Sequence, residues 1–284
     1  MNHIINSRFL FKIYYIGNRK YYGSQRQPYF VTIEQCLLDV LKKKGYIYNF
    51  SDSEFEFASR TDRFVSARGA CFSCNVEKEP ILMEINSALP KDIGIWAYAE
   101  IPMDFSPRHD AILRHYVYIV PTSISYLQKS YNINLEIMKK ACKQLEGCHD
   151  FANFSKRKTD EINTIRDMDS VILSTQNDYL IFQFKSRSFL RQQIRRMVKK
   201  ILELGKNEIL YNEFLDLFDS SKMISYQPAD PKGLILWDIE YDKNVIFIED
   251  PISIKRMYSF FLKKELNYSL KHYLFRVLQQ DDFS

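Results

Sequence analysis

Arg60-Thr61-Asp62 stands between two strand-like runs of the chain, and the question is what chemistry this short turn could do. Loops at strand ends are where a rigid scaffold displays reactive side chains. An arginine near the carboxylate would keep it ionised, lowering its pKa by about 1–3 units if the two groups pair. Such a carboxylate can act as a nucleophile or as a base. The alternative is a structural aspartate that accepts backbone N–H bonds, and the turn taken alone favours that interpretation.

A second group of residues with chemical potential lies in RHYVYIV, residues 114–120. Arg114, Tyr116 and Tyr118 alternate, so a strand places all three on one face. A tyrosine beside an active carboxylate could stack on a flat base or transfer a proton. The alternative is that both rings belong to the core, which is the usual environment of strand tyrosines.

A basic helix is predicted over residues 188–205, ending at a glycine. Its cations form two adjacent rows: Arg191, Arg195 and Lys199, spaced by four, and Arg196 with Lys200. A row of cations fits a phosphate backbone. An ordinary solvated helix face is an equally good explanation.

The segment GCHDFANFSKRK, residues 147–158, combines two phenylalanines with a basic run. It could be a loop that faces RNA. Phe151 and Phe154 could equally belong to the core.

The five cysteines do not predict a disulfide framework or a metal site. Cys71 and Cys74 form a CxxC, but positions three apart on a strand point to opposite faces. No second CxxC or histidine pair completes a zinc set. We therefore expect two half-buried strand cysteines and no metal.

Composition places the chain among globular proteins, with 284 residues, 46% of them hydrophobic and 26% charged. This length suffices for one large domain or two of ordinary size. No apolar run is long enough to cross a bilayer, and the first residues lack the ordered segments of a signal peptide. We expect a cytoplasmic protein without membrane contact. The net charge of +5 permits an anionic partner such as nucleic acid but does not demand one.

The elements that must position these residues can be predicted from periodicity and end signals. Strands are expected at 9–17, 54–60, 67–76, 93–101, 114–120, 168–175, 179–186 and 233–241. Helices are expected at 32–44, where Thr32 and Gln35 form a capping-box pattern, at 134–147 and at 188–205. Strands and helices alternate in both halves and much of the strand material is antiparallel, which predicts an α+β fold of two similar sheet-and-helix halves.

Six segments, in order, resemble those of the TruA-type tRNA pseudouridine synthases. They are YYIGNRKYYGSQRQ (14–27), FASRTDRFVSA (57–67), DFSPRHDAILRHYVYIV (104–120), LEGCHDFANF (145–154), SFLRQQIRRMV (188–198) and QPADPKGLILWDIEY (227–241). The resemblance spans about residues 9–242. It implies one continuous mixed, mainly antiparallel sheet with helices on one face and a basic cleft on the other. The halves would be 1–104 and 105–242, followed by a helical C-terminal extension, 243–284.

The resemblance also implies a role for individual residues. Asp62 would be the catalytic aspartate, Tyr116 would stack on the target uracil, and Arg195 would pair with Asp62. The expected contacts to the substrate are Arg60, Arg63, Arg108, Arg114, Arg191, Arg196 and Lys199. The implied substrate is tRNA, no metal or organic cofactor is implied, and the expected assembly is a homodimer.

The implied reaction converts uridine to pseudouridine in the anticodon stem-loop of tRNA, at positions 38–40. Arg63 and Phe64 replace the usual small residues after the R-T-D motif, and Ser24 stands where many members have tryptophan. These departures and the extra tail motivate an alternative, the same chemistry at another tRNA position or on another RNA. A further alternative, of a different class, is an RNA-binding protein that has lost catalysis.

Overall fold

The computed structural model describes residues 7–156 and 163–280. Its strands are β1 (Ser7–Tyr15), β2 (Glu56–Phe57), β3 (Ser66–Val76), β4 (Ile93–Ile101), β5 (Leu113–Ser123), β6 (Gly147–Asp150), β7 (Ile165–Gln176), β8 (Tyr179–Ser186), β9 (Leu234–Glu240) and β10 (Ile248–Glu249). Its helices are α1 (Ile33–Lys43), α2 (Leu82–Ala88), α3 (Ile124–Tyr131), α4 (Leu135–Gln144), α5 (Gln193–Gly205), α6 (Tyr211–Leu215) and α7 (Pro251–Val277), with 3-10 turns η1 (Ala152–Phe154), η2 (Asp216–Phe218) and η3 (Pro231–Gly233).

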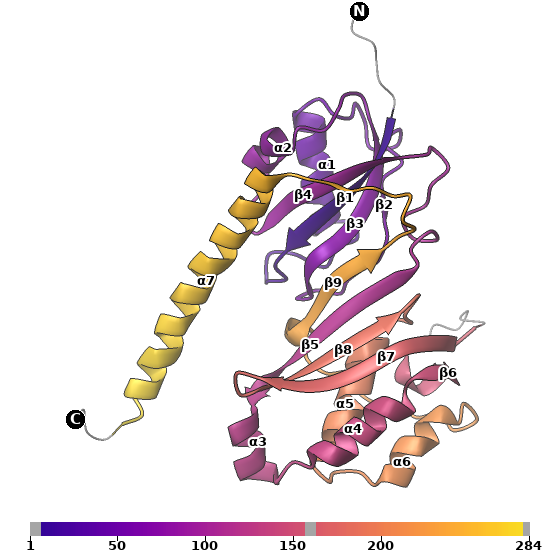
Figure 1. Ribbon diagram of the computed structural model, residues 1–284, viewed down its shortest axis with the longest axis vertical. Coiled ribbons are helices and arrows are strands. Elements are labelled where there is room, and N and C mark those ends of the chain that lie inside the picture. The colour runs from indigo at the N-terminus through magenta and orange to yellow at the C-terminus, as the bar shows by residue number, and fades with distance from the viewer. Residues whose placement is uncertain (1–6, 157–162, 281–284) are drawn as a thin grey trace, which may run out of the picture.

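All ten strands form one sheet, in the order β10-β4-β1-β3-β9-β5-β8-β7-β6, with β2 beside β3. The pairs are antiparallel except β3 with β9. The predicted α+β fold with a mixed, mainly antiparallel sheet is therefore confirmed. In Figure 1, α1 and α2 lie at the end of the molecule with β1–β4, and α4–α6 lie at the other end with β6–β8.

Strand β9 joins the two ends of the sheet and sets the position of the candidate site. It pairs in parallel with the start of β3, Ser66 opposite Ile235, and antiparallel with β5, Tyr116 opposite Leu236. Neighbouring strands lie about 4.8 Å apart. The turn that precedes β3 is therefore two strands away from Tyr116, although the two are more than 50 residues apart in sequence.

Several predicted elements are confirmed by the structure. Helix α1 begins after Thr32, whose hydroxyl accepts a hydrogen bond from the Gln35 N–H at 3.2 Å, as the capping pattern predicted. The strands predicted at 168–175 and 179–186 are β7 and β8, and the chain turns between them at Asn177 and Asp178, which both have positive φ, +49° and +64°. That conformation suits the tight two-residue turns of hairpins.

Several predicted boundaries differ from the structure, and two of these differences affect the candidate site. The strand expected at 54–60 is regular only over Glu56–Phe57, because the chain leaves the sheet after the hydrogen bond from the Ala58 N–H to the Cys71 carbonyl and forms the R-T-D turn. The helix expected from residue 188 begins at Gln193, because Gln192 has φ +61° and ends the preceding turn. Helices α2, α3 and α6 and strands β6 and β10 were not predicted from the sequence.

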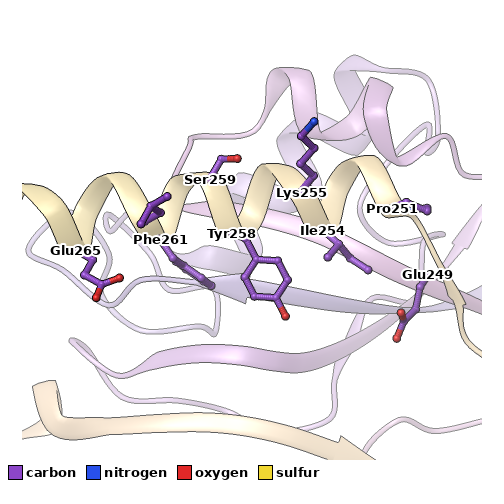
Figure 2. Close-up of a pocket in the computed structure, with 9 residues that line it drawn as sticks. Glu249, Pro251, Ile254, Lys255, Tyr258, Ser259, Phe261 and Glu265 are labelled. Carbon is purple, nitrogen blue, oxygen red and sulfur yellow. The ribbon is translucent and has the colours of Figure 1, made fainter. Parts of the chain in front are cut away.

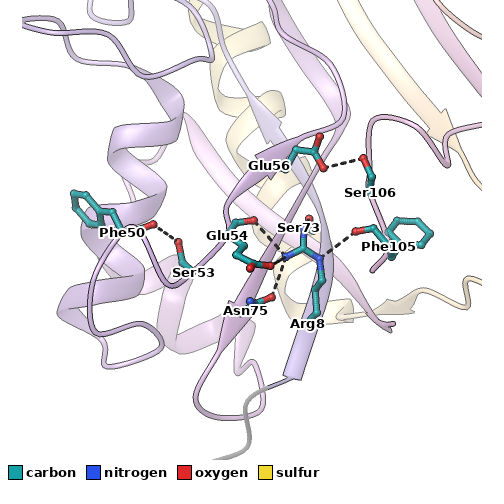
Figure 3. Close-up of polar contacts among 9 residues, drawn as sticks. All are labelled: Arg8, Phe50, Ser53, Glu54, Glu56, Ser73, Asn75, Phe105 and Ser106. Carbon is teal, nitrogen blue, oxygen red and sulfur yellow. Dashed lines mark hydrogen bonds and ion pairs between the residues drawn. The ribbon is translucent and has the colours of Figure 1, made fainter. Parts of the chain in front are cut away.

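Arg8 ties the beginning of β1 to its surroundings, far along the sheet from the R-T-D turn. Its buried guanidinium donates to Asn75 Oδ1 at 2.9 Å, to Ser73 Oγ at 2.8 Å and to the Phe105 carbonyl at 3.1 Å, as Figure 3 shows. Ser73 lies seven residues from the start of β3, about 23 Å along the strand.

Helix α7 contacts the body only near its beginning. Met257 is buried against Tyr14 and Trp96, and Phe261 meets the Tyr14 ring edge-on at 5.3 Å. Beyond Phe261 the helix extends along one side of the molecule, away from the strands, with nearly all its residues exposed (Figure 1). A hollow under its first turns is lined mainly by α7 itself (Figure 2). No helix in residues 7–156 and 163–280 is long and apolar enough to cross a membrane.

Candidate active site

The R-T-D turn is held at its middle residue. The Thr61 N–H donates to Ser24 Oγ at 2.8 Å, and the Ser24 N–H donates back to the Thr61 carbonyl at 3.1 Å. The Thr61 hydroxyl also shares a hydrogen bond with the Tyr15 hydroxyl at 2.8 Å. Ser24 is fixed in turn because its carbonyl accepts from the N–H of Glu34 in α1. The sheet and α1 together therefore hold Asp62 in place.

Gly23 allows the close approach of this loop to the R-T-D turn. Its φ is +93°, a region that L residues rarely adopt, and a Cβ added to it would lie 2.8 Å from the Thr61 carbonyl oxygen. A larger residue would have to displace the turn that carries Asp62.

Asp62 forms an ion pair with Arg195 of α5. The Arg195 Nη1 donates to Asp62 Oδ2 at 2.9 Å, and its Nε donates to the Ala229 carbonyl at 2.8 Å. The side chain of Arg195 is only 10% exposed, whereas that of Asp62 is 40% exposed. Arginine stays protonated in proteins. The site therefore combines a fixed, buried positive charge with a carboxylate that solvent and substrate can reach.

Tyr116 lies beside this pair. Its ring is 7% exposed and meets Phe189 edge-on, at 5.2 Å between centroids. Burial raises the pKa of Tyr116 above its usual value, the Asp62 carboxylate raises it slightly further, and Ser59 and Arg114 oppose the shift. Tyr116 is therefore a neutral hydroxyl at physiological pH, close enough to Asp62 to be affected by its charge.

Arg114 connects the segments around the site. Its guanidinium donates to Ser59 Oγ at 2.8 Å, to the Ala58 carbonyl at 2.9 Å, to the Arg108 carbonyl at 2.7 Å and to the Arg187 carbonyl. Burial lowers the pKa of Arg114. These bonds brace the backbone that leads into the R-T-D turn.

The expected row of cations on α5 is not a row in the structure. Arg191 is exposed but lies before the helix begins. Arg196 is 8% exposed, with its guanidinium 4.9 Å from the Tyr226 ring centre, and Lys199 pairs with Glu203 at 3.1 Å. Burial on the body side of α5 decides which of these charges reach solvent, and spacing alone does not show it.

The remaining expected contacts lie in loops. Arg60 and Arg108 are exposed. The Arg63 guanidinium lies over the Tyr22 ring, 3.8 Å from its centre, and donates to the Arg19 carbonyl at 3.1 Å. In the 147–158 segment, Phe151 and Phe154 are fully buried, so these rings belong to the core. Arg157 and Lys158, the end of its basic run, lie outside the described residues.

Four supporting residues were not predicted from sequence. They are Tyr15, Gly23, Phe189 and Ala229, which hold or line the site through the contacts given above. Gly23 had a detectable signal, since a glycine in a polar loop often marks a backbone that must turn sharply or come close to another segment. The others act through long-range contacts that have no local pattern.

No group of three or more His, Cys, Asp or Glu that could hold a metal occurs among residues 7–156 and 163–280. Cys71 and Cys74 are both buried in β3, opposite Lys12 and Phe9 of β1. Because Lys12 and Phe9 are three residues apart on a strand, the two thiols point to opposite faces.

Comparison with known proteins agrees with this geometry. A family model described as tRNA pseudouridine synthase matches residues 141–242. The protein named tRNA pseudouridine synthase A of Methanosphaera stadtmanae is 36% identical over 261 residues, 91% of this chain and 92% of the relative. That of Methanothermobacter thermautotrophicus is 33% identical over 248 residues, 87% and 86% of the two chains. The chain belongs to the TruA family of tRNA pseudouridine synthases.

As a member of this family the chain is an isomerase. A third relative, tRNA pseudouridine synthase A of Archaeoglobus fulgidus, is 31% identical over 278 residues, 98% of this chain and 99% of the relative. That match extends into residues 243–284, so the similarity to this relative includes α7, which lies beyond the segments that carried the resemblance.

Proposed function

We propose that this enzyme converts uridine to pseudouridine at positions 38–40 in the anticodon stem-loop of tRNA, with Asp62 as its catalytic residue. One observation carries the proposal: an accessible carboxylate is held by a buried arginine from the other end of the sheet, next to a buried tyrosine. This arrangement is suited to a reaction in which one side chain must reach the sugar or base of a nucleotide.

The reaction breaks the C1′–N1 bond of uridine, turns the uracil and joins C5 to C1′. The hydrogen on C5 leaves to solvent as a proton, and N1 takes up a proton, so the product is an isomer of the substrate. The target nucleotide must first leave the base stack to reach a carboxylate held by the folded body of the enzyme. Asp62 can attack C1′ or C6, or accept a proton at C2′ or C5. Arg195 fixes the direction of the carboxylate in each case.

Tyr116 supplies the wall against which the detached uracil can rest. Its ring is fixed by Phe189, and its raised pKa keeps the hydroxyl neutral, so it adds no negative charge beside the anionic substrate. In our proposal the exposed cations Arg60, Arg108 and Arg191 contact the phosphates of tRNA. We also propose a homodimer, which sedimentation equilibrium would test.

The experiment that tests this function is tritium release from tRNA that carries 5-³H-uridine. We expect release with the wild type and none with Asp62→Asn, whose amide oxygen can still accept the bond from Arg195. The affinity of Asp62→Asn for tRNA should stay close to that of the wild type, because a single carboxylate contributes little to the electrostatic grip on RNA.

Asp39→Asn is a matched control, because Asp39 is an exposed aspartate of α1. It should release tritium at the wild-type rate. Activity that persists in Asp62→Asn would refute the role of Asp62, and full tRNA binding without any release by the wild type would favour a non-catalytic RNA-binding protein. Sequencing of the modified positions would separate positions 38–40 from another tRNA site.

A further inference from the structure

Four flat groups, each close to the next, lead from the loop after β1 to the R-T-D turn. The Phe30 and Tyr22 rings are parallel within 22°, with centroids 4.1 Å apart. The Arg63 guanidinium lies 3.8 Å from the Tyr22 ring centre and 4.8 Å from that of Phe64. We call these four residues, Phe30, Tyr22, Arg63 and Phe64, the aromatic stack. It starts in the loop after β1 and ends at Phe64, two residues from the catalytic carboxylate.

Phe64 is held in a conformation that a bulky residue rarely adopts. Its φ is +71°, in the left-handed region, which costs of order 1–3 kcal/mol for a residue other than glycine. The turn is closed by a hydrogen bond from the Val65 N–H to the Asp62 carbonyl at 3.2 Å. Gly17 packs so closely on it that a Cβ there would lie 2.3 Å from the Phe64 carbonyl. The turn hydrogen bond and the close packing of Gly17 thus fix the backbone that carries the partly exposed Phe64 side chain.

A side chain from the other end of the sheet, that of Lys232, approaches the ring of Phe64. The Lys232 ammonium lies 5.8 Å from the ring centre, and its side chain is 68% exposed. Its contact with Asp230 is long, at 4.0 Å. Lys232 belongs to η3, directly after the Ala229 carbonyl that Arg195 binds, so the two ends of the sheet meet at Phe64 as they do at Asp62.

Resting on the proposed function, we propose that Phe64 is a stacking shelf for the base that neighbours the target uridine, and that Lys232 pairs with a phosphate of that nucleotide. Extrusion of the target leaves its neighbour without a stacking partner. An aromatic ring can replace that partner, and every base has a face that it can accept. Asp62 and Phe64 are two residues apart, within about 7 Å between Cα atoms, so a base on the shelf is adjacent to a nucleotide at Asp62.

The test is a cycle that combines a protein substitution with an RNA substitution. Phe64→Leu and the wild type are compared on an anticodon stem-loop RNA, and again on the same RNA with an abasic nucleotide directly 5′ or directly 3′ of the target. On the intact RNA we expect kcat/KM of Phe64→Leu to fall by about 5- to 150-fold, the range that base stacking on an aromatic supplies. On one of the two abasic RNAs the variant and the wild type should differ by less than about twofold. Phe64→Tyr, which keeps the ring, should retain wild-type kcat/KM on the intact RNA.

Phe50→Leu serves as a matched control. The Phe50 ring also lies under two cations, Arg26 and Lys42, both at 5.5 Å, but in the loop after α1. It should leave kcat/KM unchanged on all three RNAs. A loss in Phe64→Leu that is equal on intact and on both abasic RNAs would overturn the shelf and show a structural role.

The phosphate contact has its own test, on a side chain too exposed to be needed for folding. Lys232→Met should reduce the slope of log affinity against log salt by about one unit on the intact RNA. An unchanged slope would overturn the role of Lys232. The results that refute the shelf differ from those that refute the proposed function. A wild type that releases no tritium refutes the function. An active wild type, combined with the same loss in Phe64→Leu on the intact and on both abasic RNAs, refutes only the shelf.

Discussion

Arg195→Lys tests whether the direction of the Asp62 carboxylate matters, because it keeps the positive charge and changes the donors. In the wild type Nη1 reaches Asp62 at 2.9 Å while Nε holds the Ala229 carbonyl at 2.8 Å. A lysine ammonium is a single centre and stands about one bond short of the Nη1 position. It cannot donate to both acceptors at these distances.

The size of the effect follows from the bonds that are lost. A hydrogen bond to a charged group contributes about 1.5–3 kcal/mol. If that contribution is needed to hold Asp62 in its reactive position, kcat/KM should fall by about 10- to 150-fold, at 1.36 kcal/mol for each factor of ten. The affinity for tRNA should change by less than about threefold, because the charge is kept and Arg195 is buried.

The assay is tritium release under single-turnover conditions, together with tRNA binding and urea unfolding of each variant. Arg8→Lys is the matched control. Arg8 is also a buried arginine with several hydrogen bonds, but it belongs to β1 and lies opposite Asn75, at the end of β3 far from the R-T-D turn. Arg8→Lys should lower the free energy of unfolding and leave kcat/KM unchanged. The reasoning is refuted if Arg195→Lys keeps kcat/KM within threefold of the wild type, or if Arg8→Lys loses as much rate.

Three further predictions concern the backbone and the thiols. Gly23→Ala should lower the free energy of unfolding by about 1–3 kcal/mol and reduce the rate of tritium release. The reason is that φ +93° and the 2.8 Å approach to the Thr61 carbonyl oxygen both disfavour a Cβ at this position. An unaffected rate would show that the turn tolerates displacement. At neutral pH exposed Cys148 should react rapidly with Ellman's reagent, while Cys71 and Cys74 react only after denaturation, because burial raises their pKa to about 12. Because burial raises the pKa of these two thiols, they lose their protons in the unfolded protein at lower pH than in the folded protein. The urea concentration at the midpoint of unfolding should therefore fall as the pH rises from about 9 towards 12. A midpoint that is independent of pH in this range would contradict the burial of the thiols.

Local patterns in the sequence were sufficient for much of the fold and for the main candidate. The strand predicted at 93–101 matches β4 residue for residue, and Thr32 caps α1 as expected. The R-T-D turn could be singled out because a carboxylate after a strand is a local feature. The capping and periodicity signals involve residues within a few positions of one another, so they can be recognised without knowledge of the fold.

The tertiary structure alone decided how distant segments meet. No local pattern placed β9 between β3 and β5, yet this parallel pairing brings Asp62 near Tyr116 and Arg195. Nor could four-residue spacing distinguish buried Arg196 from exposed Arg191, since burial depends on what packs against the helix.

The sequence by itself therefore determined which groups could react and which elements would carry them. The tertiary structure decided which of these groups share a site, because hydrogen-bond geometry, burial and the aromatic stack depend on segments that lie far apart in the chain. The separation of 133 residues between Asp62 and Arg195 makes the point: their 2.9 Å contact exists only once both ends of the sheet are joined.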